Sequence, residues 1–187
     1  MKKLRAVGLR VFLICSLLVM HTTVPRIAAG QGNSMSEYEL KASILVNLTR
    51  FVEWPTSSYT NPKAPIVLCV LGRDPFGNLL RSAVLNKTVE GRLMLIRYPQ
   101  NDRDIGGCHI LFISSSERKA TAEIFSILKG SSVLTVGEMT QFAVHGGMVQ
   151  LLLEDQQVHF DINMNVASGS GLKISAKLLV IARIVTS

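Results

Sequence analysis

The stretch from Ile66 to Gly72 limits the fold more than any other part of the sequence. It is a continuous apolar run with β-branched residues at Ile66, Val67 and Val70, and Pro65 precedes it. A strand that is apolar on both faces is typical of the centre of a parallel sheet that helices cover on both sides. The sequence therefore predicts an α/β fold organised around this strand.

The segments on either side of this strand fit an α/β fold. Ser36 is a plausible helix N-cap, and Glu39 completes a capping box. We expect helices at 37–54, 78–85, 117–129 and 172–185, strands at 93–98, 108–114 and 133–136, and a hairpin formed by 148–154 and 158–164. This order predicts a single three-layer α/β domain, with a mostly parallel sheet, an antiparallel C-terminal hairpin and helices on both faces.

Residues 1–30 have the pattern of a secretory signal peptide. Basic residues come first, an apolar core of ten residues follows at 11–20, and small residues at 28–30 suit cleavage. We therefore divide the chain into a signal peptide at 1–30, a flexible lead-in at 31–36 and a folded domain at 37–187. An uncleaved membrane anchor is the alternative interpretation of the first segment.

The positive charge of the chain belongs mostly to this leader. The first thirty residues hold five of the twenty Lys and Arg residues and none of the thirteen Asp and Glu residues. The exported part then carries fifteen basic against thirteen acidic residues, a net charge of about +2. A basic surface with interleaved aromatic residues is absent from the sequence, so we do not expect nucleic acid as a partner.

Export places the two remaining cysteines, Cys69 and Cys108, in a compartment where disulfides persist. They lie on two predicted strands that should be neighbours in the sheet, which favours one bridge between them. Two buried free thiols are the alternative. A metal site is not expected, because the sequence has no clustered Cys and His residues at ligand spacing.

The sequence contains no recognisable catalytic set. The turn from Gly72 to Gly77 follows a strand, but it is neither a G-x-G-x-x-G motif nor a Walker motif. We interpret it as a structural turn in which Asp74 caps the next helix. His109 falls in a predicted buried strand and is expected to be a structural histidine. These observations favour a binding protein over an enzyme, with no cofactor.

Several motifs together resemble the YfiR family of exported regulators. Each is modest alone, but their order and spacing span about residues 37–184. The motifs are Glu39–Ala42, Phe51–Pro55 (F-V-E-W-P), Val70–Gly77, Cys108–Ile113, Val133–Val136, Gly146–Val149, Phe160–Asn163 and Gly171–Leu179.

The resemblance implies a periplasmic repressor that binds the periplasmic sensor region of a membrane-bound diguanylate cyclase. Such a repressor keeps cyclic-di-GMP low and so opposes biofilm formation. The resemblance also implies a tendency to form homodimers and matches the pair Cys69 and Cys108 to a family disulfide. Some members carry a second cysteine pair near the hairpin, but residues 141–154 contain none here, so a redox switch on that pair is not expected.

The same resemblance implies that the hairpin and the entry to the last helix contact the partner. The residues implied are Val149, Phe160, Asp161, Ile162, Val166 and Lys173. Alternation of apolar and polar residues along 158–163 places Phe160 and Ile162 in the core, so Asp161 and Lys173 are the better candidates for the surface.

A small-molecule binding or sensing module is the alternative function. It would use the crevice at the carboxyl ends of the central strands, near Arg73 and Asp74, where open α/β sheets commonly bind ligands.

Overall fold

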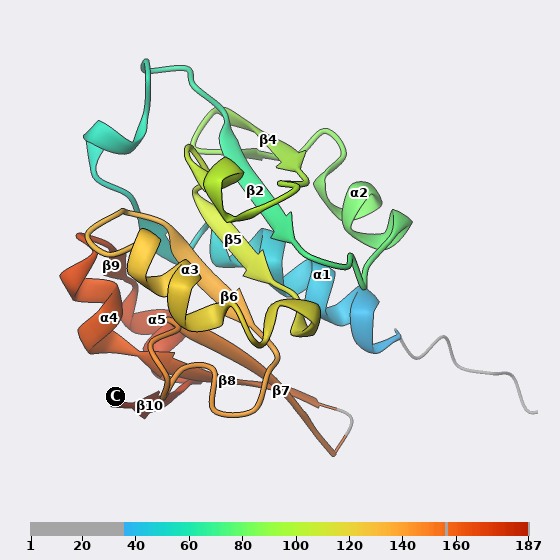
Figure 1. Ribbon diagram of the computed structural model, residues 1–187. Coiled ribbons are helices and arrows are strands. Elements are labelled where there is room, and N and C mark those ends of the chain that lie inside the picture. Colours follow the sequence, from blue (N-terminus) through green and yellow to red (C-terminus); the bar gives the residue numbers. More distant parts are fainter. Residues whose placement is uncertain (1–35, 156, 187) are drawn as a thin grey trace, which may run out of the picture. The chain divides into compact units, whose positions relative to one another are not determined.

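The computed structural model describes residues 36–155 and 157–186, so the signal-peptide prediction lies outside the described residues. An eight-stranded sheet runs in the order β10-β8-β7-β6-β5-β2-β4-β3 (Figure 1). Its neighbouring strands are parallel except for the pairs β7–β8 and β3–β4. The predicted α/β domain with a C-terminal antiparallel hairpin is confirmed.

The strands and helices have the following bounds. The strands are β1 (Val52–Glu53), β2 (Ile66–Leu71), β3 (Thr88–Val89), β4 (Arg92–Arg97), β5 (Ile110–Ile113), β6 (Leu134–Gly137), β7 (Val149–Glu154), β8 (Gln157–Asn163), β9 (Lys173–Ile174) and β10 (Arg183–Val185). The α-helices are α1 (Glu37–Leu48), α2 (Asn78–Val84), α3 (Thr121–Ile127), α4 (Met164–Gly169) and α5 (Ala176–Leu179), and short 3₁₀ turns are η1 (Thr56–Ser58), η2 (Asp102–Ile105) and η3 (Ser115–Glu117).

Strand β2 lies at the centre of two apolar layers, as its sequence predicts. Ile66, Leu68 and Val70 face the core that contains the buried residues of α1 and α2. Cys69 and Leu71 face the opposite core, which contains Ile124 of α3. Figure 1 shows α1 and α3 on the two faces of the sheet. The alternation of the strand therefore fixes a three-layer arrangement.

Helix α1 starts as predicted but ends early. The Ser36 hydroxyl accepts a hydrogen bond from the Glu39 amide at 3.3 Å, which is the expected N-cap. The helix ends at Leu48, and Val52–Glu53 forms β1, which pairs antiparallel with β9. The predicted helix over 37–54 is wrong because the partner of β1 lies about 120 residues away in the sequence and leaves no local signal.

The C-terminal segment is also different from the prediction of one helix over 172–185. It consists of β9, the four-residue helix α5 and β10. Ser175 caps α5, and β10 then pairs parallel with β8, with Ile184 opposite Ile162. The β-branched residues from Val180 onward favour a strand where an open sheet edge is available.

The predicted bridge between Cys69 and Cys108 is present, with the two Cα atoms 5.9 Å apart. Both cysteines are buried in the core below α3. The Arg97 guanidinium lies 3.3 Å from the Cys108 sulfur and also donates to the carbonyl groups of Asp104 and Gly106. The bridge therefore ties β2 to the loop that precedes β5.

Gly147 has no room for a side chain, and we expect Gly147→Ala to destabilise the fold by about 1–3 kcal/mol. A Cβ atom there would lie 2.8 Å from the Phe142 carbonyl oxygen and closer still to the buried Phe142 ring. Urea unfolding measures the change. Gly106→Ala is the matched control, since nothing lies within 4 Å of its Cβ position. Equal stability of the two variants would contradict the prediction.

Candidate functional site

The C-terminal edge of the sheet exposes aliphatic side chains that a monomer normally covers. Val180 is 84% exposed, Ile181 63% and Ile184 49%. They lie in the turn after α5 and on β10, whose outer side has no neighbouring strand among the residues that the structure describes. We call Val180, Ile181 and Ile184 the C-terminal patch. An exposed aliphatic cluster beside a free strand edge is typical of a surface that binds another protein.

Two contacts hold this patch in place. Arg183 binds both carboxylate oxygens of Asp161, at 2.7 and 2.8 Å, which fixes β10 against β8. The Ser175 amide donates to the Phe51 carbonyl at 2.8 Å, which fixes the start of α5 beside β1. The patch is therefore carried by a segment that is anchored at both ends.

The residues that the family resemblance implied for partner contact are not all at the surface. Val149 and Ile162 are fully buried in the core. Phe160 and Val166 are half-buried. Lys173 is exposed, and its ammonium lies 4.0 Å from the Glu53 carboxylate. The structure therefore leaves Lys173 as the freely accessible residue of this set.

The surface position expected for Asp161 is wrong. Its side chain is buried, because β10 covers the outer side of β8 and Arg183 pairs with its carboxylate. The next polar residue on the same strand, Asn163, is buried as well, and its amide donates to the Ala143 carbonyl. The prediction treated 158–163 as half-exposed because the strand β10 was not foreseen.

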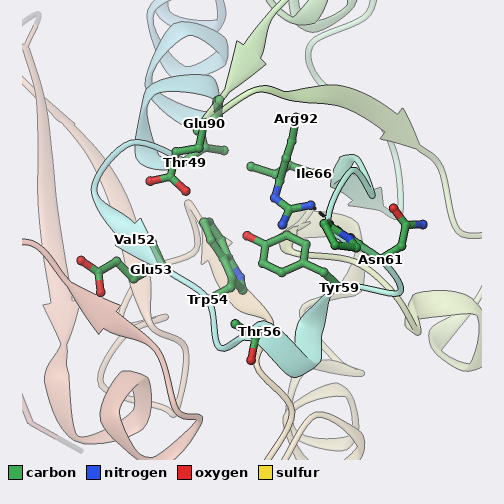
Figure 2. A pocket seen from close by; sticks show the side chains of 12 residues that line it. Thr49, Val52, Glu53, Trp54, Thr56, Tyr59, Asn61, Ile66, Glu90 and Arg92 are labelled. Atoms are coloured by element: carbon green, nitrogen blue, oxygen red, sulfur yellow. Dashed lines mark hydrogen bonds between the residues drawn. The ribbon is translucent and has the colours of Figure 1, made fainter.

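A hollow of about 530 Å³ opens at the amino ends of the central strands (Figure 2). Its walls come from the end of α1, from β1, from the loop 54–62 and from the starts of β2 and β4. The lining residues are Thr49, Val52, Glu53, Trp54, Thr56, Tyr59, Asn61, Pro62, Ile66, Val89, Glu90 and Arg92. Glu53 and Trp54 belong to the F-V-E-W-P motif, so this motif contributes both to the core and to the hollow.

Aromatic and cationic groups are stacked along one wall of the hollow. The Arg92 guanidinium lies 3.8 Å from the centre of the Tyr59 ring, and Tyr59 stacks on His109 at 5.0 Å. Trp54 donates its indole N–H to the His109 carbonyl at 3.1 Å. Trp54 is buried, as expected for a residue that closes the core, but its edge also lines the hollow.

His109 is buried and neutral, as its predicted structural role requires. Its Nδ1 accepts the Val67 amide at 3.1 Å, so that nitrogen carries no proton. Burial lowers the pKa of His109 below its usual 6.5, the Arg92 charge lowers it further, and a backbone contact to Ser58 opposes both.

We expect the fold to lose stability as the pH falls below about 6.5, because the unfolded chain then protonates His109 while the folded chain does not. Protonation of His109 in the unfolded chain lowers the free energy of unfolding by at most about 1.4 kcal/mol for each pH unit. Urea unfolding between pH 7.5 and 5 measures it, and His109→Asn should flatten the curve. His159→Asn is the control, since His159 is exposed. An unchanged slope in His109→Asn would contradict this role.

Arg73 and Asp74 do not form the crevice suggested for the alternative function. The Arg73 side chain is exposed, and its amide donates to the Ser116 hydroxyl at 2.9 Å. The Asp74 carboxylate accepts the Phe76 amide at 2.8 Å, while Gly77 is the N-cap of α2. Asp74 therefore stabilises its own turn instead of capping the helix. Neither residue lines the hollow in Figure 2.

A buried ion pair occupies the carboxyl end of β6 instead. Lys41 of α1 is buried, and its ammonium lies 2.5 Å from Glu37 and 2.6 Å from Glu138. Burial lowers the pKa of Lys41, but hydrogen bonds to these carboxylates outweigh burial and leave the pKa raised. The contact with Glu138 ties α1 to the segment after β6. The i,i+4 spacing of Glu37 and Lys41 is a local signal for their pair, whereas Glu138 lies 97 residues from Lys41 and no local pattern points to it.

Comparison with known proteins identifies the family. The model of the YfiR/HmsC-like family matches residues 38–183. The chain belongs to this family. The match includes β1 and the first residue of β10, so the hollow and two of the three residues of the C-terminal patch, Val180 and Ile181, lie in the matched segment.

Two solved structures share the fold. A conserved domain protein from Vibrio cholerae O1 biovar El Tor is similar with a TM-score of 0.54 and 11% identity over 80% of this chain. The ABC domain from Streptococcus pneumoniae in complex with L-Trp is similar with a TM-score of 0.52 and 11% identity over 77% of this chain. The YfiR/HmsC-like chain spans 60% of the length of each.

The described part of the chain has no helix that is long and apolar enough to cross a membrane. It contains one disulfide, which agrees with a location outside the cytoplasm.

Proposed function

We propose that this YfiR/HmsC-like protein is an exported regulator that binds the periplasmic sensor region of a membrane diguanylate cyclase and represses it. The observation that supports this proposal is the C-terminal patch on an anchored segment. Val180 and Ile181 are 84% and 63% exposed, and apolar side chains of this kind make up the core of a protein interface. Repression then lowers the production of cyclic-di-GMP in the host.

The patch favours an extended or helical apolar segment as the bound part of the partner. The residues 172–187 contain Lys173, Lys177 and Arg183 and no acidic residue. Arg183 is paired with Asp161 and Lys173 lies 4.0 Å from Glu53, so among the described residues Lys177 is the cation of this segment that has no carboxylate within 4 Å. An apolar partner surface that carries an acidic group suits it. Lys173, which the resemblance implied for partner contact, is exposed on β9 in the same C-terminal segment.

Capture from membranes tests the proposal. The tagged, exported protein is mixed with detergent-solubilised membranes of its host, and bound proteins are identified by mass spectrometry. We expect enrichment of a membrane protein that carries a cyclase domain, and deletion of the regulator should raise cellular cyclic-di-GMP. The proposal fails if no such protein is enriched over a control domain under both oxidising and reducing conditions.

A further inference from the structure

The outer edge of β10 presents backbone hydrogen-bonding groups at Ile184. The Asn163 amide donates to the carbonyl of Met148, just before β7, at 2.9 Å, so the backbone of Asn163 points toward β7. Backbone groups of successive strand residues point to opposite sides, so those of Ile162 point toward β10. Ile162 lies opposite Ile184 in this parallel pair. The neighbours of Ile184 therefore complete the ladder with β8, and the N–H and C=O of Ile184 point away from β8.

Two common devices that protect an edge strand are absent from this one. β10 is the last strand in the sheet order, and Figure 1 shows it beside β8. Natural edge strands are often protected by proline or by an unpaired charge. Residues 180–186 contain no proline, and their one charged side chain, Arg183, is paired with Asp161. The edge is therefore open to one more strand.

The side chains around this edge are aliphatic and positively charged. The helical turn of α5 continues to Val180 and Ile181, which lie three and four residues after Lys177 and so are its neighbours on the helix surface. In the part of the chain that the structure describes, no carboxylate lies within 4 Å of the Lys177 ammonium. Residues 172–187 hold no acidic residue. A second copy paired edge to edge would bring like charges together, whereas an apolar strand with an acidic residue complements this surface.

We propose that the sensor region of the membrane cyclase adds an extended segment to the outer edge of β10. The segment pairs its backbone with the N–H and C=O of Ile184, and it places apolar side chains against the C-terminal patch. An acidic residue of the segment pairs with Lys177. Strand addition to an open sheet edge is a common way to recognise an extended segment. This inference rests on the proposed repressor function and deepens it, because it states which kind of partner segment is bound.

Hydrogen exchange of the wild-type regulator tests the pairing without a variant. The partner is the full-length cyclase recovered by capture from membranes, kept in detergent, and exchange is followed by mass spectrometry on overlapping C-terminal peptides. Binding should slow exchange of the Ile184 amide about 10-fold or more, because the amide passes from solvent into a hydrogen bond. An unchanged Ile184 amide in the saturated complex overturns the proposal. Protection that develops in the regulator alone and rises with its concentration also overturns it, since a second copy then occupies the edge.

Two substitutions at Ile184 separate the backbone from the side chain. Proline keeps three side-chain carbons but lacks the N–H, whereas alanine keeps the N–H and only the Cβ atom. We expect Ile184→Pro to weaken cyclase binding about 10- to 30-fold, and Ile184→Ala about 3- to 5-fold. If the side chain alone were recognised, the proline variant would bind at least as tightly as the alanine variant.

Val185→Pro is the matched control for the direction of the backbone groups. The Val185 N–H points toward β8, so its loss should lower the melting temperature of the regulator. The Ile184 N–H points outward, where an edge strand tolerates proline, so Ile184→Pro should melt close to the wild type. An equal loss of melting temperature in the two proline variants overturns the orientation of Ile184 from which the proposal follows.

The results distinguish strand addition from the repressor function. If the wild-type regulator binds the cyclase and Ile184→Pro binds as tightly as Ile184→Ala, strand addition is wrong and the repressor function stands. If the wild type does not bind the cyclase, both are wrong. Weaker binding of Ile184→Pro than of Ile184→Ala, together with protection of the Ile184 amide in the wild-type complex, supports strand addition.

Discussion

Replacing Cys69 and Cys108 together by alanine is expected to lower the melting temperature by about 10 °C. The bridge closes a loop of 39 residues. The chain-entropy model gives about 4 kcal/mol for a loop of that length, and a domain of 150 residues or more loses about 2–4 °C for each kcal/mol. Burial of both cysteines adds to this, since two small side chains leave the core below α3 less well filled.

Thermal unfolding followed by circular dichroism measures the loss. Wild-type protein treated with a reductant should melt close to the double variant, and the reductant should not change the variant itself. The bridge is then structural. A melting temperature within about 2 °C of the oxidised wild type would instead show that the native core holds β2 and β5 without it.

The sequence was sufficient for the elements whose signals are local. Three structures follow from local signals: the apolar run predicts β2, Ser36 predicts the start of α1, and the composition of the turn predicts the β7–β8 hairpin. The cysteine pair could be predicted because Cys69 lies on β2 and Cys108 lies just before β5, and the two strands are neighbours in the parallel order. The hydrophobic pattern was enough to predict these elements, and the expected export to an oxidising compartment was enough to predict the disulfide.

The errors in β1, β9, β10 and Asp161 arise from pairings between distant segments. The two-residue strands β1 and β9 exist only because Val52 lies opposite Ile174. Strand β10 exists because β8 offers an open edge, and it converts Asp161 from a surface residue into a buried partner of Arg183. Periodicity in a short window does not contain this information, because a β-branched run reads equally well as one side of a helix.

The hollow was missed for the same reason. Its lining comes from the end of α1, β1, the loop before β2, and the β3–β4 turn, and the F-V-E-W-P motif, which contributes Glu53 and Trp54, does not by itself indicate a hollow. The prediction chose the carboxyl ends of the strands, where many α/β proteins bind ligands. Here the ion pair of Lys41 and Glu138 occupies the carboxyl end of β6, and the open space lies at the amino ends. The general rule for α/β sheets therefore predicted a binding site at the wrong edge of this sheet.

Introducing two charges into the C-terminal patch should abolish repression while leaving the fold intact. Val180→Asp with Ile181→Asp is expected to weaken binding to the cyclase sensor region by about 100-fold or more, since central apolar anchors in interfaces each contribute about 2 kcal/mol or more. Both side chains are mostly exposed, so the free energy of unfolding should change little. Co-purification with the cyclase and cellular cyclic-di-GMP are the two measurements.

The opposite side of the sheet provides a matched control for this variant. Leu93 and Leu95 on β4 are 58% and 49% exposed, and Leu93→Asp with Leu95→Asp introduces the same charge at comparable exposure. This control should bind and repress as the wild type does. If both pairs reduce repression equally, the effect is one of charge and not of a docking site. If neither does, the patch near β10 is not the contact surface, and Lys173 with the β1–β9 pair becomes the next surface to test.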